Sequence, residues 1–119
     1  MIFSPPENYA CPKGSLVELN ILAFMTEEMQ ILKALACSVR YRILTQILIE
    51  PDYTTSLSKK LNIESSLVTH SLKRLEKVGL LLTYRNGKLK YYEIADKRAM
   101  RNLFSSLERL SRKNREALH

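Results

Sequence analysis

Apolar side chains between residues 26 and 50 recur every three or four positions, the period of a helix with one buried face. Thr26 followed by two glutamates is typical of a helix start, because threonine caps free N–H groups and acids favour the positive end of the helix dipole. The pattern predicts a helix over 27–36, with a shared face of Met29, Leu32, Leu35 and Ala36. A second helix follows Cys37 and ends at Glu50, before Pro51.

Two further short helices, joined by a tight turn, are predicted between residues 53 and 79. The first carries Leu57 and Leu61 on its apolar side, and either Thr54 or Thr55 caps it. Asn62-Ile63-Glu64 forms the turn. The pair therefore has the layout of a helix-turn-helix unit.

The second helix of this pair has two chemically different faces. Ser65 or Ser66 caps it, and its buried stripe holds Val68, Leu72 and Leu75. Gly79 follows where the end of a helix favours positive φ. Opposite the stripe or beside it lie Ser66, Thr69, His70, Lys73, Arg74 and Lys77. Short hydroxyls allow a close approach to base edges, and the cations suit phosphates.

A β-hairpin is predicted next, because Asn86-Gly87 separates the runs 80–85 and 88–94, which are rich in Leu, Tyr and Thr. A two-residue turn at Asn86-Gly87 places apolar side chains on both faces. We expect one of these two faces to be covered by a third strand, by the N-terminal arm or by a partner subunit. The cations near the tip are Arg85, Lys88 and Lys90.

The last predicted helix begins at the cap Asp96 and runs to about Arg115. Its apolar positions alternate in steps of three and four, which predicts an a/d seam and a homodimer interface formed by Met100, Leu103, Leu107, Leu110 and Asn114. The alternative is that this seam docks on its own domain.

One domain is expected in a chain of 119 residues. Residues 1–14 contain three prolines and a glycine and predict an irregular arm, and 15–25 fits a helix or a strand, of which we prefer the helix. The expected fold is mainly α with a small β-hairpin (α+β), a winged helix-turn-helix with N- and C-terminal dimerisation helices. Its parts are a domain over 15–119, a helix-turn-helix over 54–78, a wing over 80–94 and a C-terminal helix over 96–115.

The net charge of +7 is unevenly distributed along the chain. Residues 1–52 carry four basic and six acidic side chains, whereas residues 53–119 carry fifteen and six. A basic half of this kind favours a polyanionic partner, nucleic acid first. Joined to the helix-turn-helix and the cationic wing, it predicts binding to double-stranded DNA through Thr55, Ser65, Ser66, Thr69, His70, Lys73, Arg74, Lys77, Arg85, Lys88 and Lys90.

Other classes of protein are disfavoured by what the sequence lacks. No apolar run is long enough to span a membrane and no secretory signal is visible, so we expect a cytoplasmic protein. Two cysteines make no disulfide framework. We find no nucleophile–base pair, phosphate loop or metal-ligand set, and therefore expect neither an enzyme nor a bound cofactor.

Several motifs in this order resemble the ArsR-type (arsenical-repressor-like) winged-helix regulators. The opening of that family is similar to 32–36 followed by 40–44, and its helix-turn-helix is similar to 57–63, 68–75 and 78–80. The exit of its wing is similar to Tyr91-Tyr92-Glu93-Ile94-Ala95-Asp96. The resemblance implies a dimeric DNA-binding repressor, with Ser65, Ser66, Thr69, His70 and Lys73 on the base-reading stretch.

Two departures from that family concern metal sensing. Its sensors carry a Cys-x-Cys-type pair in the first helix of the motif, where this chain has Thr54-Thr55-Ser56-Leu57. Other members use histidines on the last helix, whereas no histidine follows Asp96 before His119. We therefore expect no metal site, and a small-molecule effector stays unidentified.

Two functions from different classes are compatible with these patterns. The first is a sequence-specific transcriptional regulator, a homodimer on a pseudo-palindromic operator. The second is a winged-helix module that binds protein and not DNA, which the doubly apolar hairpin favours and the basic half disfavours.

Overall fold

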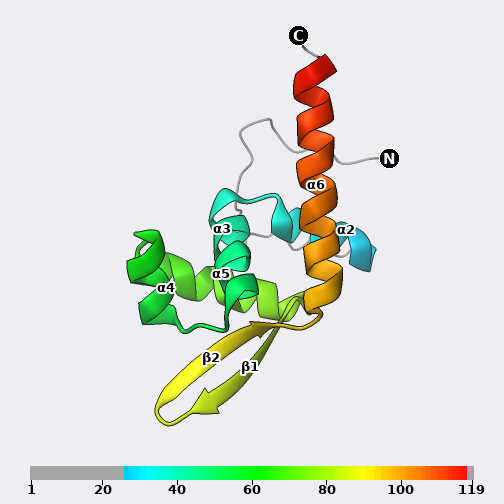
Figure 1. The fold of residues 1–119 in the computed structure, drawn as a ribbon. Helices are drawn as coiled ribbons and strands as arrows, with labels where there is room; N and C mark the ends of the chain where they lie inside the picture. Colours follow the sequence, from blue (N-terminus) through cyan, green and yellow to red (C-terminus); the bar gives the residue numbers. More distant parts are fainter. Residues whose placement is uncertain (1–25, 118–119) are drawn as a thin grey trace, which may run out of the picture.

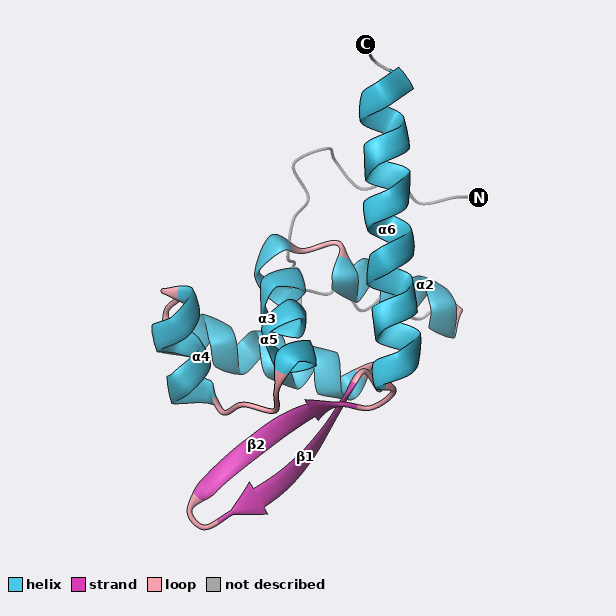
Figure 2. Cartoon of the chain, viewed as in Figure 1, coloured by secondary structure: helices cyan, strands magenta, loops and turns pink. Residues whose placement is uncertain are grey.

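The structure of the chain, a computed structural model, describes residues 26–117, with side chains as far as 115. The predicted arm and the predicted helix over 15–25 lie outside the described residues. Figure 1 shows the order of the elements, which are α2 (Glu27–Leu35), α3 (Ser38–Ile49), α4 (Thr54–Leu61), α5 (Ser65–Lys77), β1 (Leu81–Asn86), β2 (Leu89–Ile94) and α6 (Lys97–Ala117). The described part is thus mainly helical with one antiparallel hairpin (Figure 2), which confirms the winged helix-turn-helix fold.

The core lies where α3, α5 and the base of the hairpin meet. Each element contributes one apolar face, as the helical and alternating patterns of the sequence predict. The largest fully buried side chains are Ile43, Leu44 and Ile47 from α3, Leu57 from α4, Val68, Leu72 and Leu75 from α5, and Leu81 from β1. This packing holds α5 by one stripe and leaves its opposite side to solvent.

Two of the predicted helix starts are confirmed and two are wrong. The Thr26 hydroxyl accepts a hydrogen bond from the Met29 N–H at 3.3 Å, and the Asp96 carboxylate accepts one from the Ala99 N–H at 3.0 Å. The N-cap of α4 is Tyr53 and not Thr54 or Thr55, and the N-cap of α5 is Glu64 and not Ser65 or Ser66. Tyr53 and Glu64 make no capping hydrogen bond through their side chains. The preference of helix starts for serine and threonine therefore placed these two caps one or two residues too late.

The end of α5 is a Schellman motif, in which two backbone bonds close the last turn. The Leu80 N–H donates to the Leu75 carbonyl and the Gly79 N–H to the Glu76 carbonyl, both at 3.0 Å. Gly79 has φ +86°, which glycine adopts without steric cost, as predicted. The motif turns the chain directly from α5 into β1.

The hairpin turn lies one residue later than predicted. Asn86 pairs with Leu89, so the turn residues are Gly87 and Lys88 and not Asn86-Gly87. Gly87 has φ +65° and Lys88 is not in the positive region, the pattern of a type II′ turn with glycine first. Tyr84 therefore faces Tyr91, although the division of side chains between the two faces is as expected.

Arg40 and Cys37 are buried where α2 passes into α3. The Arg40 guanidinium donates to the Ala34 carbonyl at 2.6 Å and to the Lys33 carbonyl at 3.4 Å. It thus supplies hydrogen bonds to carbonyl groups at the C-terminal end of α2, which lack partners within the helix. Burial lowers the pKa of Arg40. Cys37 is disulfide-bonded, contrary to the expectation from sequence. No helix in 26–117 has the length and apolar character to cross a bilayer.

Candidate nucleic-acid interface

Helix α5 presents its predicted polar and cationic face to solvent. Ser65, Ser66, His70, Lys73 and Lys77 are exposed, and Thr69 and Arg74 are partly buried at the edges of this face. Thr55 of the preceding helix is also exposed. The side of α5 that must be free to enter a DNA groove is thus not used for packing within the chain.

Two hydroxyls near the start of α5 already have partners. The Thr69 hydroxyl donates to the Ser65 carbonyl, and the Ser66 hydroxyl donates to the Glu64 carboxylate, each at 3.0 Å. A contact from either donor to a base therefore exchanges one hydrogen bond for another. Glu64, which the sequence predicted only as part of the turn, thus sets an acid beside the predicted base-reading residues.

The wing carries its cations as predicted, and all three of them are exposed. Arg85 and Lys90 lie directly opposite each other in the ladder, and the Lys90 ammonium lies 5.3 Å from the centre of the Tyr92 ring. Like charges in a cross-strand pair destabilise a hairpin. A polyanion bound to the wing would relieve this repulsion. Lys88 lies in the turn itself.

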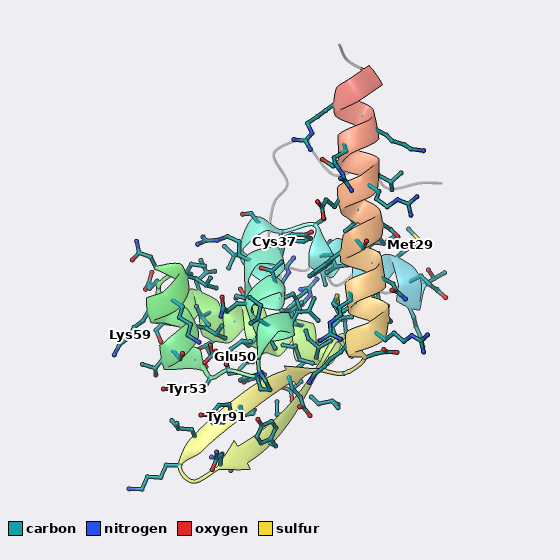
Figure 3. All side chains as sticks on the ribbon, viewed as in Figure 1. Met29, Cys37, Glu50, Tyr53, Lys59 and Tyr91 are labelled. Carbon is teal, nitrogen blue, oxygen red and sulfur yellow. The ribbon has the colours of Figure 1, made fainter. Side chains whose placement is uncertain are left out.

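An aromatic cluster that was not predicted from the sequence joins the wing to the helix-turn-helix. The Tyr91 ring stacks on Tyr84 with centroids 5.5 Å apart, and its other neighbour is Tyr53, edge-on at 5.3 Å. Figure 3 shows Tyr53 and Tyr91 close together where the start of α4 meets β2. The correct hairpin register would have revealed the Tyr84–Tyr91 pair, but no local pattern points to Tyr53.

The segment before α4 is also bonded to the wing through its backbone and through Asp52. Asp52 and Tyr92 exchange two backbone hydrogen bonds of 3.1 and 2.8 Å. The Asp52 carboxylate accepts from the Tyr53 N–H and from the Lys60 ammonium, both at 2.9 Å. The helix-turn-helix and the wing are therefore held together at this junction, which fixes the angle between them.

The Lys60 ammonium also donates to Glu50 at 3.2 Å. Its hydrogen bond to Asp52, and then the one to Glu50, raise the pKa of Lys60 above its ordinary value of 10.5. A raised pKa in the folded chain means that this contribution to stability is complete below the ordinary pKa. The contribution is lost as the pH rises through the raised value.

We expect Asp52→Asn to lower the free energy of unfolding by about 1–3 kcal/mol, because Asp52 is 3% exposed and the substitution replaces its charge-assisted hydrogen bond to Lys60 by a neutral one and buries an amide in its place. Urea unfolding at neutral pH measures this change. The matched control is Glu50→Gln, whose side chain is 62% exposed and whose removal should cost less than about 0.5 kcal/mol. Equal losses for the two variants would show that Asp52 is not the residue that holds the junction.

The predicted dimer seam on α6 changes character along the helix. Met100 is 5% exposed and packs in the core of its own domain, so its assignment to the dimer interface is corrected. Leu103 is partly buried against the same core. Leu107, Leu110 and Asn114 are exposed. The C-terminal part of α6 extends beyond the other elements (Figure 1).

No group of three or more histidine, cysteine, aspartate or glutamate side chains in the described range could hold a metal ion. The arrangement around α5 and the wing can instead supply hydrogen-bond donors, acceptors and cations along an extended surface. Such a surface suits recognition of a charged polymer.

Solved structures with this fold include several regulators. A homodimeric winged helix-turn-helix DNA-binding domain from Mycobacterium bovis, described as a possible ArsR-family transcriptional regulator, is 22% identical, with a TM-score of 0.67 over 86% of this chain and 91% of that one. HlyU from Vibrio cholerae is 26% identical, with a TM-score of 0.61 over 68% of this chain and 90% of that one. The fold resembles ArsR-type regulators, as the motifs predicted.

The cadmium sensor CMTR from Mycobacterium tuberculosis is 30% identical, with a TM-score of 0.57 over 65% of this chain and 80% of that chain. Among curated proteins, none matches the sequence. The family described as an uncharacterized protein conserved in archaea, DUF2250, matches residues 29–101, which include the helix-turn-helix and the wing. The chain therefore belongs to the DUF2250 family, and its fold is that of the ArsR-type winged-helix regulators.

Proposed function

We propose that this protein is a sequence-specific, double-stranded DNA-binding transcriptional regulator, a repressor that acts as a homodimer. The observation that carries the proposal is the solvent-exposed polar and cationic side of α5, with Ser66, His70, Lys73 and Lys77, which lies opposite a fully buried stripe. The major groove of DNA is wide enough to hold one helix, which packs on its own domain with one face and contacts the bases with the other.

In this proposal, Ser65, Ser66, Thr69 and His70 read base edges near the start of α5. Contacts to phosphates, which position the protein on the duplex, come from the cations of α5 and the wing, Lys73, Arg74, Lys77, Arg85, Lys88 and Lys90, and from Thr55. The contacts of Asp52 and the tyrosine cluster hold the helix-turn-helix and the wing at a fixed angle to each other.

The homodimer is supported by exposed apolar side chains on both terminal helices of the described chain. Leu107 and Leu110 are exposed on α6, and Met29 and Leu32 are exposed on α2. A second copy of the chain would cover them and give the two-fold symmetry that places two recognition helices about 34 Å apart on a pseudo-palindromic operator. Leu103 and Asn114 complete this proposed interface.

Lys73→Ala is the first test of this placement. For a dimer that neutralises about 6–8 phosphates, log K should fall with log salt with a slope of about −5 to −7. Lys73→Ala should weaken binding to all sequences and make that slope shallower by about 2, because a dimer has two such lysines. A titration of a duplex chosen from a random pool, followed by fluorescence anisotropy at several salt concentrations, measures both quantities.

Thr69→Ala and His70→Ala form the matched comparison. They should leave the salt slope unchanged and reduce the ratio of affinities between the selected duplex and a scrambled one. A Lys73→Ala protein with the slope of the wild type would contradict the proposed position of α5 on the phosphates.

A second candidate function is protein binding without DNA, and the outer face of the wing favours it. Leu82, Tyr84 and Leu89 are exposed on that face, away from the core. If the wild-type protein fails to bind random duplex DNA even at low salt, this second function replaces the first.

A further inference from the structure

More of the positive charge of the basic half lies on α6 and the residues after it than on the helix-turn-helix and the wing. Residues 97–119 carry seven cationic and two acidic side chains, a net charge of +5. Residues 53–96 carry eight and four, a net charge of +4. The recognition surface therefore accounts for less than half of the charge that indicates a polyanionic partner.

The cations of α6 are free to bind a partner. All seven, Lys97, Arg98, Arg101, Arg109, Arg112, Lys113 and Arg115, are exposed. Among the residues that the structure describes, none of the seven takes part in an ion pair. Figure 3 shows long side chains that end in nitrogen projecting from α6 along its length.

The far half of α6, residues 108–117, carries four of these seven cations, Arg109, Arg112, Lys113 and Arg115. Arg109 and Lys113 are one helical turn apart, and Arg112 lies three residues from Arg109. Arg109 and Lys113 repel each other at this spacing, whereas Glu108 lies four residues before Arg112, so residues 108–113 keep a net charge of +2. Arg109, Arg112 and Lys113 define what we call the distal patch.

The distal patch lies far from the proposed recognition surface. Figure 1 shows the tip of the hairpin and the C-terminal end of α6 at opposite ends of the molecule. A duplex that contacts the wing tip therefore runs along the end of the molecule away from the distal patch.

The side chains around the patch favour one kind of polyanion. The one aromatic ring of α6, Phe104, packs against Tyr41 with centroids 4.8 Å apart, so α6 offers no ring on which single-stranded bases could stack. A membrane surface would need Leu107 and Leu110, the side chains that the proposed dimer covers. Cations without an aromatic or apolar companion suit the phosphates of a duplex.

We propose that the distal patch, Arg109, Arg112 and Lys113, binds the backbone of a second segment of double-stranded DNA, so that the protein bridges two duplexes. The inference extends the proposed function, because the first duplex occupies α5 and the wing. The second contact is independent of base sequence, since it consists of charge alone.

The experiment separates the two surfaces with two sets of substitutions. The recognition variant carries Thr69→Ala, Lys73→Ala and Lys77→Ala, and the patch variant carries Arg109→Gln, Arg112→Gln and Lys113→Gln. The matched control, Arg109→Lys with Arg112→Lys, keeps the charge of the patch. Circular dichroism verifies that each protein is folded.

The first measurement is fluorescence anisotropy with a random 30-base-pair duplex at 50 mM salt. The recognition variant should still bind, and adding the patch substitutions to it should weaken that binding at least tenfold, whereas adding the control pair should change it less than twofold. Unchanged affinity after the patch substitutions would overturn the inference. The inference would also be overturned if the distal patch bound the protein to phosphatidylglycerol vesicles and not to DNA.

The second measurement tests bridging, by retention of a labelled duplex on beads that carry an unlabelled one. The wild-type protein should retain it, and the patch variant should lose at least four fifths of the signal while its affinity for one selected duplex changes less than threefold. If the recognition variant loses all binding to DNA, the inference fails and the proposed function stands. If the recognition variant binds like the wild type, the proposed function fails and the distal patch is the DNA-binding surface.

Discussion

Leu110→Glu is expected to separate the proposed homodimer into monomers and to weaken binding to a two-half-site duplex by at least about 100-fold. Leu110 is 65% exposed on α6, so most of a large apolar side chain is left open to solvent by the described chain. Burying two carboxylates at a two-fold interface would cost far more than burying two leucines. Because two linked half-site contacts gain about 10²–10⁴ in affinity over one, loss of the dimer removes that gain.

Sedimentation equilibrium gives the mass of the protein, and anisotropy gives its affinity for the duplex. The matched control is Asn102→Glu, which adds the same charge to an exposed position about a quarter-turn away from the Leu103–Leu110 seam. It should leave the mass unchanged and affect binding only slightly. A Leu110→Glu protein that sediments as the wild type does would contradict the α6 interface.

Leu72→Ala is expected to lower the free energy of unfolding by about 2–5 kcal/mol, a large share of the about 5–15 kcal/mol that small domains possess. Leu72 is fully buried and belongs to the stripe by which α5 docks on the core. The substitution removes apolar contacts and leaves a cavity under the recognition helix. DNA binding should weaken in parallel, because this packing positions the outward face of α5.

Urea unfolding monitored by circular dichroism measures the loss. Leu82→Ala makes the same chemical change on the wing, where Leu82 is 52% exposed, and should cost less than about 1 kcal/mol. A similar loss at both positions would mean that the stripe of α5 does not carry the stability that its burial implies.

The elements that were predicted from sequence share a local cause. The helical stretch of α5 and its C-terminal end follow from the period of Val68, Leu72 and Leu75 and from Gly79, each of which acts over a few residues. The exposure of Lys73 and Lys77 follows in turn, because a helix that buries one stripe must expose the other.

The features that were missed depend on contacts distant in sequence or on small differences in energy. Asn86-Gly87 and Gly87-Lys88 both offer a glycine to the turn, and only the pairing along the whole hairpin selects the second. Tyr53 meets Tyr91 across 38 residues. Met100 was assigned to the seam because the 3–4 spacing does not distinguish a helix that packs on its own domain from one that packs on a partner.

The backbone bridge between Asp52 and Tyr92 also bears on self-association. A two-stranded hairpin has two open edges, and each is a template on which another molecule can add a strand. The bridge occupies part of the edge of β2, and the paired charges of Arg85 and Lys90 repel a second hairpin nearer the tip. The same cations that we propose to hold phosphates would therefore keep the protein from polymerising when no duplex is bound.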